Sequence, residues 1–206
     1  MGCRQMEHSK AYRTFIECAH ASGAEKFHMV FPADVFEQIY SWEREEIEDV
    51  IWNCFLKRDF SFIGFLPRLN KYDGTAALKA EYEKSKNINI AQILYNETKD
   101  SKYLDEIINC IENDGESPES VQALIKCISS PKRNNALYKV YVESDNGAIR
   151  LAVVTRILRE KGIIENPNSL GWMNNPEKKE LFKKLMSDDK EVRKANVEKF
   201  INDAFD

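Results

Sequence analysis

The sequence predicts an all-α fold, and three observations support this prediction. Apolar residues recur every three or four positions through most of the 206 residues, which is the period of an amphipathic helix. Glycine (8) and proline (6) are scarce, whereas sandwiches and barrels need turn formers every few residues. Hydrophobic residues make up 43% of the chain, enough for a continuous core. We therefore expect about twelve helices and no strand, since even residues 139–142, which have some β propensity, keep helical spacing.

The first half of the chain is expected to form helices that each carry one apolar stripe. Proline suits a first helical turn, so Pro32 begins one of them, whereas Pro67 should kink or shorten another. Asp73 and Gly74 form a cap before the next helix. The expected helices are residues 9–22, 32–40, 43–57, 59–66, a helix from 74 that carries Leu78 and Tyr82, and 90–97.

The second half shows clearer start and stop signals. Ser117 and Pro118 have the residue types of an N-cap and a first helical position, and Gly162 is a stop signal. Asp145 is expected to cap the helix at 148–161. Residues 163–175 form the one long irregular stretch. The other expected helices are 103–112, one from 118 to about 128, 135–143, 177–186, and a last one after Ser187.

Two segments of the chain resemble each other. Residues 144–152 and 187–195 each contain an acidic turn, a β-branched residue, an arginine and then an alanine two positions later. Arg193 follows Arg150 by 43 residues, within the period of roughly 40 to 47 residues found in HEAT and armadillo arrays. Residues 116–122 form a weaker third copy. Through these residues the last third of the chain resembles the HEAT-repeat family.

The HEAT resemblance implies a HEAT-like α-solenoid of about five antiparallel helix pairs, forming one domain over residues 1–206 with a break at 163–175. In such arrays an aspartate and an arginine commonly join neighbouring repeats. Asp145, Arg150, Asp188 and Arg193 would then be structural residues, although solvated surface charge is the alternative for all four. A stack of helix pairs offers a broad face rather than a deep cavity, and most members of the family bind proteins or other polymers there.

A second resemblance concerns residues 66–74, Leu-Pro-Arg-Leu-Asn-Lys-Tyr-Asp-Gly. This run looks like the joint in small HEAT-like bacterial immunity proteins of toxin–immunity loci. The resemblance implies a cytoplasmic protein that neutralises a cognate toxin by direct binding. A structural explanation also exists, because an Asp-Gly cap with apolar anchors accounts for the same residues.

Charge is distributed unevenly. The net charge is −4, so the basic surplus typical of nucleic-acid binders is absent. Residues 34–49 contain seven acids and one base, and residues 97–119 contain eight acids and two bases. These acids, with nearby tryptophans, could dock a basic partner, or they could be ordinary solvated helix faces and packing aromatics. The candidate protein-binding residues are Glu45, Glu48, Asp49, Trp52, Asp105, Glu106 and Trp172.

The sequence contains no motif that indicates catalysis or metal binding. The five cysteines include no C-x-x-C pair and are expected to be reduced core thiols. His8, His20 and His28 do not have the spacing of metal ligands with Cys18. The basic stretch through Lys126, Lys132, Arg133 and Lys139 lacks interleaved aromatics for base stacking. We therefore expect no cofactor, no metal and no enzymatic activity.

The functional hypothesis is a cytoplasmic protein that binds another protein, in its most specific form a basic toxin domain. No run of about 18 apolar residues and no secretory signal is found, so no membrane partner is expected. A structural adaptor in a larger assembly is the main alternative. A HEAT-like nucleic-acid repair enzyme is a third hypothesis, which the acidic net charge disfavours.

Overall fold

The structure is a computed structural model that describes residues 7–21, 34–113, 115–164 and 175–202. Within these ranges every regular element is a helix, which confirms the all-α prediction, and residues 139–142 lie inside a helix as expected. In the described ranges, no helix combines the length and the apolar character needed to cross a bilayer.

The chain divides into two compact units, residues 1–85 and 86–206. Each unit has its own buried core. No signal in the sequence marks a boundary at residue 85, and a single continuous repeat domain over residues 1–206 stays a prediction. The expected break at 163–175 lies largely outside the described residues.

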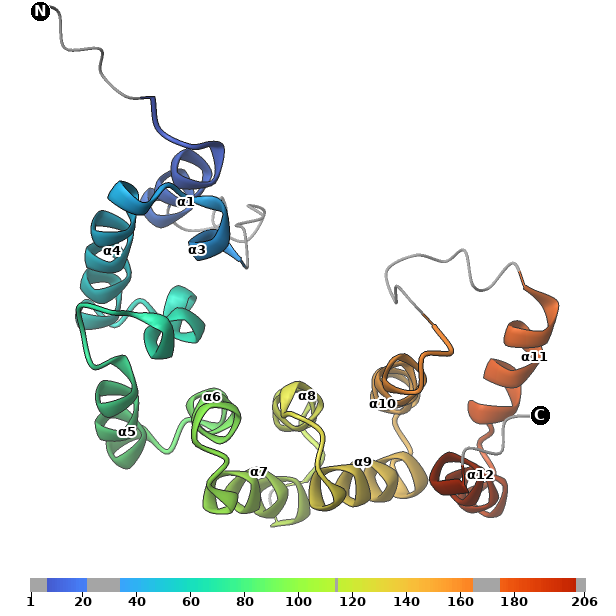
Figure 1. Cartoon of the computed structure of the whole chain (residues 1–206). Helices are drawn as coiled ribbons and strands as arrows, with labels where there is room; N and C mark the ends of the chain where they lie inside the picture. The colour runs from blue at the N-terminus through green and yellow to red at the C-terminus, as the bar shows by residue number, and fades with distance from the viewer. Residues whose placement is uncertain (1–6, 22–33, 114, 165–174, 203–206) are drawn as a thin grey trace, which may run out of the picture. The chain divides into compact units, whose positions relative to one another are not determined.

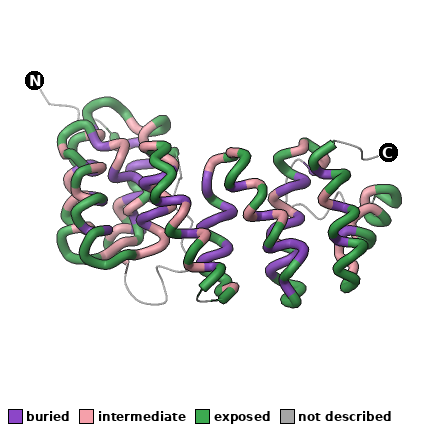
Figure 2. The backbone as a smooth tube through the Cα atoms, turned by 90° about the horizontal axis from the view of Figure 1, so that it is seen from below, coloured by how far each residue is buried: buried purple, intermediate pink, exposed green. Residues whose placement is uncertain are grey.

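Unit 1 is built around helix α4. Its elements are α1 (Lys10–His20), α3 (Val35–Gln38), η1 (Ser41–Glu43), α4 (Arg44–Leu56), η2 (Phe60–Arg68) and α5 (Gly74–Ser85). Helix α4 packs against α1 on one side and η2 on the other, and α5 packs against η2. The rings of Phe15 and Phe62 meet at 4.8 Å in the core, beside the fully buried Ile47 and Leu66. Buried residues lie on the sides of the helices that face their neighbours (Figure 2).

Element η2 differs from the expected α-helix at 59–66, because it is a 3₁₀ helix that continues through Pro67 to Arg68. The turn from η2 into α5 then brings Gly74 against η2. A Cβ on Gly74 would lie 1.9 Å from the carbonyl oxygen of Leu66, so only glycine fits there. Asp73 caps α5 as predicted, since its Oδ1 accepts from the N–H of Ala76 at 2.9 Å.

Unit 2 arranges its helices in two rows (Figure 1). One row contains α6 (Ile88–Thr98), α8 (Pro118–Lys126) and α10 (Gly147–Glu160), and the other contains α7 (Ser101–Asn113), α9 (Pro131–Glu143) and α12 (Lys190–Asn202). Helix α8 contacts both α6 and α10, and α9 contacts α12. Helix α11 (Pro176–Leu185) packs on α12.

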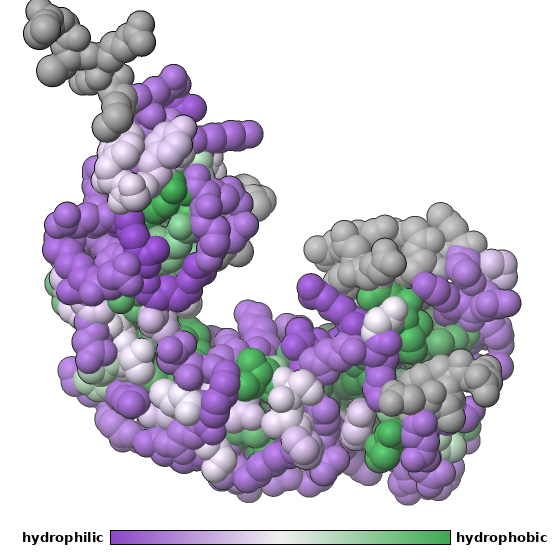
Figure 3. Space-filling model, in the orientation of Figure 1, coloured by the Kyte–Doolittle hydropathy of each residue, from purple (hydrophilic) through white to green (hydrophobic). Residues whose placement is uncertain are grey.

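The apolar core of unit 2 lies between these two rows. Figure 3 shows that hydrophilic residues cover most of the visible face of unit 2 and that apolar residues reach it in separate patches. The fully buried side chains include Ile90, Leu94, Ile107, Leu124 and Val153. Leu94, Ile107 and Leu124 lie on apolar stripes that the sequence periodicity identifies.

Helix caps in unit 2 follow the sequence signals with two corrections. Ser117 Oγ accepts from the N–H of Ser120, and Gly162, with φ of +70°, follows the end of α10; both agree with the prediction. The cap of α10 is Asn146, however, whose Oδ1 accepts from the N–H of Ala148 at 2.9 Å. Asp145 was expected in this role and is exposed instead. Helix α9 also begins at Pro131 rather than 135, because Ser130 supplies its N-cap.

Candidate protein-binding surfaces

Not every acid of the stretch at 34–49 lies at the surface, where it could contact a partner. Glu48 is 2% exposed, and its carboxylate accepts from the N–H groups of Asn70 and Lys71 at 2.9 and 2.8 Å and from Arg44 Nε at 2.8 Å. The assignment of Glu48 to a protein-binding surface is therefore wrong. Its carboxylate holds the loop between η2 and α5 against α4 through these hydrogen bonds, and the loop N–H groups in turn satisfy a buried carboxylate.

The neighbouring candidates have intramolecular partners as well. Lys71 Nζ donates to Glu45 at 3.0 Å and to Asp49 at 2.9 Å, and the hydroxyl of Tyr72 donates to Asp49 at 2.6 Å. The ammonium of Lys71 and the hydroxyl of Tyr72 hold the pKa of Asp49 below its usual value. Trp52 is half-buried and stacks on Tyr72 with ring centroids 4.6 Å apart. These residues join α4 to the loop that follows η2.

A second buried carboxylate, Glu43, immediately precedes α4. Glu43 is 0% exposed and accepts from the N–H and the hydroxyl of Ser9, both at 2.7 Å. It also accepts from the N–H of Tyr40 at 2.8 Å and lies 3.1 Å from His8 Nδ1. Burial raises the pKa of Glu43, but these hydrogen bonds outweigh burial and leave the pKa below 4.5. Glu43 therefore joins the start of α1 to η1.

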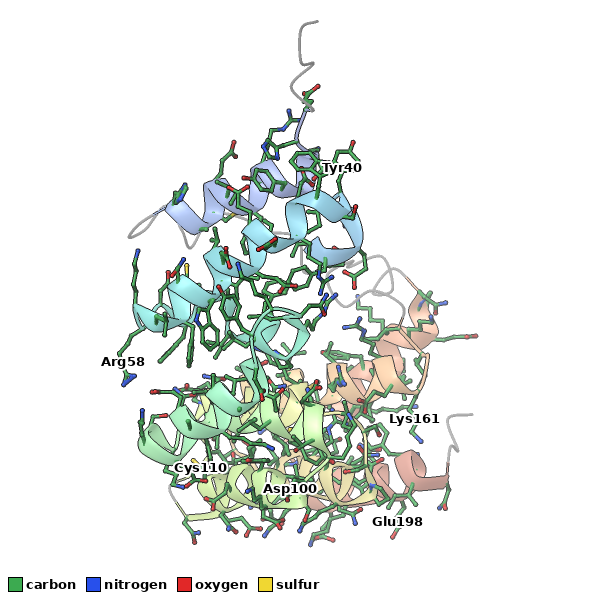
Figure 4. All side chains as sticks on the ribbon, turned by 60° about the vertical axis from the view of Figure 1, so that its left-hand side comes forward. Tyr40, Arg58, Asp100, Cys110, Lys161 and Glu198 are labelled. Carbon is green, nitrogen blue, oxygen red and sulfur yellow. The ribbon has the colours of Figure 1, made fainter. Side chains whose placement is uncertain are left out.

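A row of aromatic rings that is exposed at one end begins at His8, next to Glu43. His8 stacks on the buried Tyr12 at 4.0 Å and meets Trp42 at 4.8 Å, and Trp42 continues to Tyr40 at 6.1 Å. Tyr40 and Trp42 are 53% and 42% exposed, and Figure 4 shows Tyr40 near the surface of unit 1. Exposed aromatics of this kind are common anchors in protein interfaces.

Three buried arginines, Arg133, Arg150 and Arg193, organise unit 2. Each occupies the third or fourth position of its helix and donates to carbonyl oxygens at or just after the end of another helix. Arg133 donates to Leu124 and Ile125 of α8, and Arg150 donates to Ser144 after α9. Arg193 donates to Val142 of α9 and to Ser187 and Asp188 after α11. The last carbonyls of a helix have no partner within it, so these guanidinium groups satisfy them.

Two of these arginines also reach a carboxylate from another helix or turn. Arg150 Nη2 donates to the carboxylate of Asp188, and Arg133 Nη1 donates to Glu160 at 2.7 Å. The Arg150–Asp188 contact is of the kind that the HEAT resemblance implies. Arg133 was grouped with a basic stretch, but it is 0% exposed and offers no surface charge. An arginine three residues after an N-cap serine was the available signal for its role.

The remaining acidic candidates fall in and around α7. Asp105 pairs with Lys132 of α9, and Glu106 is exposed. Trp172 lies outside the described residues. Lys132 and Lys139 both pair with acids of α7, so part of the positive charge of the basic stretch is balanced within the molecule.

An apolar groove of about 230 Å³ lies between α7 and α9. Its floor is apolar and consists of Ile108, Ile111, Leu124, Ala136 and Val140, and its rim is charged and consists of Glu112, Glu116, Lys139 and Glu143. We call these nine residues the acid-rimmed groove. Two of its glutamates belong to the acidic stretch at 97–119. Sequence periodicity could not find this groove, since its residues come from three helices and one loop.

A larger and more polar hollow of about 630 Å³ lies between α9 and α10. Asn134, Tyr138, Glu160 and Lys161 are among the residues that line it.

Near the end of α8, burial raises the pKa of the Cys127 thiol to about 12, although Arg133 opposes the shift. In the described part of the chain, no three His, Cys, Asp or Glu side chains gather closely enough to hold a metal ion.

Comparison of the chain with family models, with curated proteins and with solved structures finds no match.

Proposed function

We propose that this protein is a HEAT-like α-solenoid that binds another protein. The observation that carries the proposal is the set of buried arginines in unit 2. Arg133, Arg150 and Arg193 each fasten the start of one helix to the end of another, which fixes the spacing of successive helix pairs. Such an internal frame holds a broad surface in a defined shape, and protein recognition is the common use of that surface in helical-repeat proteins.

The surfaces of both units support the same proposal. Unit 2 carries the acid-rimmed groove, and unit 1 exposes Tyr40 and Trp42. A protein interface typically combines an apolar or aromatic centre with a polar rim. The most specific form of the proposal is an immunity protein that neutralises a basic toxin domain. It draws on the resemblance of residues 66–74 and on the acidic residues that remain at the surface.

The test begins with the purified full chain, which is immobilised on a resin and incubated with an extract of its source organism. Proteins that bind to the chain are then cross-linked to it and recovered. Each protein recovered is then produced separately and mixed with the chain, and the affinity and stoichiometry are measured by calorimetry. We expect one partner to form a 1:1 complex with a Kd below about 1 μM, which corresponds to roughly −8 kcal/mol. An unrelated helical protein of equal net charge serves as the control bait.

Two further measurements separate the rival functions. If the partner is a toxin, its expression should arrest growth, and co-expression of the chain should restore it. A DNA mobility shift that weakens steeply with salt would instead favour the nucleic-acid alternative. Absence of any complex that survives reconstitution from purified components would refute the proposed function.

A further inference from the structure

The acid-rimmed groove has the size of a site for a side chain. Its volume of about 230 Å³ lies below the roughly 300–1,000 Å³ of sites for drug-sized ligands and cofactors. Ile108 and Ala136 are partly exposed at its opening, whereas Leu124 and Val140 below them are buried. Apolar anchors that a partner inserts into such grooves are a recurring mode of helix recognition. The groove therefore suits one or two aliphatic side chains of a protein segment.

The rim of the groove selects for positive charge. Three glutamates, Glu112, Glu116 and Glu143, face one lysine in the lining. Lys139 Nζ donates to Glu112 at 2.7 Å, and Lys190 Nζ donates to Glu143 at 3.3 Å. Exposed pairs of this kind are weak and exchange readily with other cations. An excess of carboxylates remains around the apolar floor, and complementary charge steers association and excludes acidic partners.

Lys139 occupies a place that a cation of the partner could take. It lies on α9, and its ammonium reaches Glu112 of α7 on the opposite side of the groove. The pKa of Lys139 is raised, first by its hydrogen bond to Glu112 and further by the nearby Glu143. Its ammonium thus competes with an incoming lysine or arginine. Removal of Lys139 should therefore increase affinity for a basic segment, whereas removal of the glutamates should decrease it.

We propose that the acid-rimmed groove binds a basic segment of a partner protein, which inserts an aliphatic side chain between α7 and α9 and places lysine or arginine residues against Glu112, Glu116 and Glu143. This inference rests on the proposed function and names the site and the partner chemistry for it. The sign of the charge effect makes it specific, because substitutions of opposite sign in one groove must change affinity in opposite directions.

The probe is a synthetic helical peptide of 15 residues that carries leucines on one face and lysines elsewhere; a second peptide has glutamate in place of each lysine. The full chain is labelled with ¹³C at isoleucine methyl groups and titrated with each peptide. We expect the methyl signals of Ile108 and Ile111 to shift with the lysine peptide and not with the glutamate peptide. Shifts confined to other isoleucines, or equal binding of the two peptides, would overturn the assignment.

Variants of the full chain give the quantitative test. Ile108→Asn should weaken binding of the lysine peptide about tenfold or more, since it replaces an apolar contact with a polar group and adds no charge. Glu112→Gln and Glu143→Gln should each weaken it about two- to fivefold, the range of exposed ion pairs, and Lys139→Gln should strengthen it by a similar factor. Glu97→Gln and Glu198→Gln, at exposed positions outside the groove, are matched controls and should change Kd less than about twofold.

Glu143 and Lys139 are exposed, so variants at these two positions still test the inference if Ile108→Asn impairs folding. Weaker binding by Lys139→Gln would contradict the inference directly. The natural partner, once reconstituted, distinguishes the two proposals. If it binds the Glu112→Gln, Glu143→Gln double variant with unchanged Kd, the protein-binding function stands and the groove assignment fails. If the unsubstituted chain forms no complex with any purified protein, the proposed function itself fails.

Discussion

Substitution of Glu43 by glutamine should destabilise the protein substantially although it changes only one side-chain atom. In the carboxylate, Oε1 accepts from the N–H of Ser9 and Oε2 accepts from the N–H of Tyr40. The amide of glutamine offers only one acceptor oxygen, so in either orientation one backbone N–H loses its partner. A buried donor without an acceptor costs about 1–3 kcal/mol, and bonds to a charged acceptor are stronger than those to a neutral one. We therefore expect a loss of about 2–3 kcal/mol at pH 7.

The effect should also depend on pH in a defined direction. The folded-state pKa of Glu43 lies below 4.5, so the unfolded chain binds more protons at acidic pH. The contribution of the carboxylate is complete above pH 4.5 and disappears as the pH falls through the folded-state pKa. The difference in unfolding free energy between the unsubstituted protein and Glu43→Gln should therefore become smaller as the pH falls below 4.5.

The assay is urea unfolding of both proteins, followed by tryptophan fluorescence, to which Trp42, next to Glu43 in the sequence, contributes. Measurements at pH 7 and at steps below pH 4.5 give the two differences. Glu45→Gln is the matched control. Glu45 is exposed, and Lys71 keeps its contact with Asp49 when the charge of Glu45 is removed. A loss below about 0.5 kcal/mol at pH 7, the scatter of surface substitutions, would refute the reasoning. So would a difference that stays constant on acidification.

Three further predictions follow from the packing. Gly74→Ala should lower the melting temperature measured by circular dichroism, because a Cβ would lie 1.9 Å from a backbone oxygen, whereas Gly64→Ala, with nothing within 4 Å, should be neutral; equal effects would contradict the packing. Arg193→Met should cost about 2–4 kcal/mol in chemical unfolding, since it leaves buried carbonyls without a donor, and Lys194→Ala on the exposed side should cost little. Cys127, with its pKa raised to about 12, should resist iodoacetamide at pH 8 until the protein unfolds, and mass spectrometry of the labelled peptides would reveal early modification.

Local signals predicted the helices well because they act over a few residues. The apolar stripes of α4 and α7, the N-cap at Ser117 and the stop at Gly162 depend only on neighbours three or four positions away. Where two polar residues compete for one cap, sequence was insufficient. Asp145 and Asn146 are both good capping residues, and the backbone geometry selected Asn146.

The sequence by itself determined the all-α class and the approximate helix positions, because periodicity and capping are encoded in adjacent residues. Only the tertiary structure decided which acids are buried. Glu45 and Glu48 look alike in the sequence, yet Glu48 accepts from backbone N–H groups of a loop 22 and 23 residues away, whereas Glu45 remains exposed. The same holds for the acid-rimmed groove, whose parts come from α7, α8 and α9. Contacts across such separations depend on how the helices pack, which no short-range pattern records.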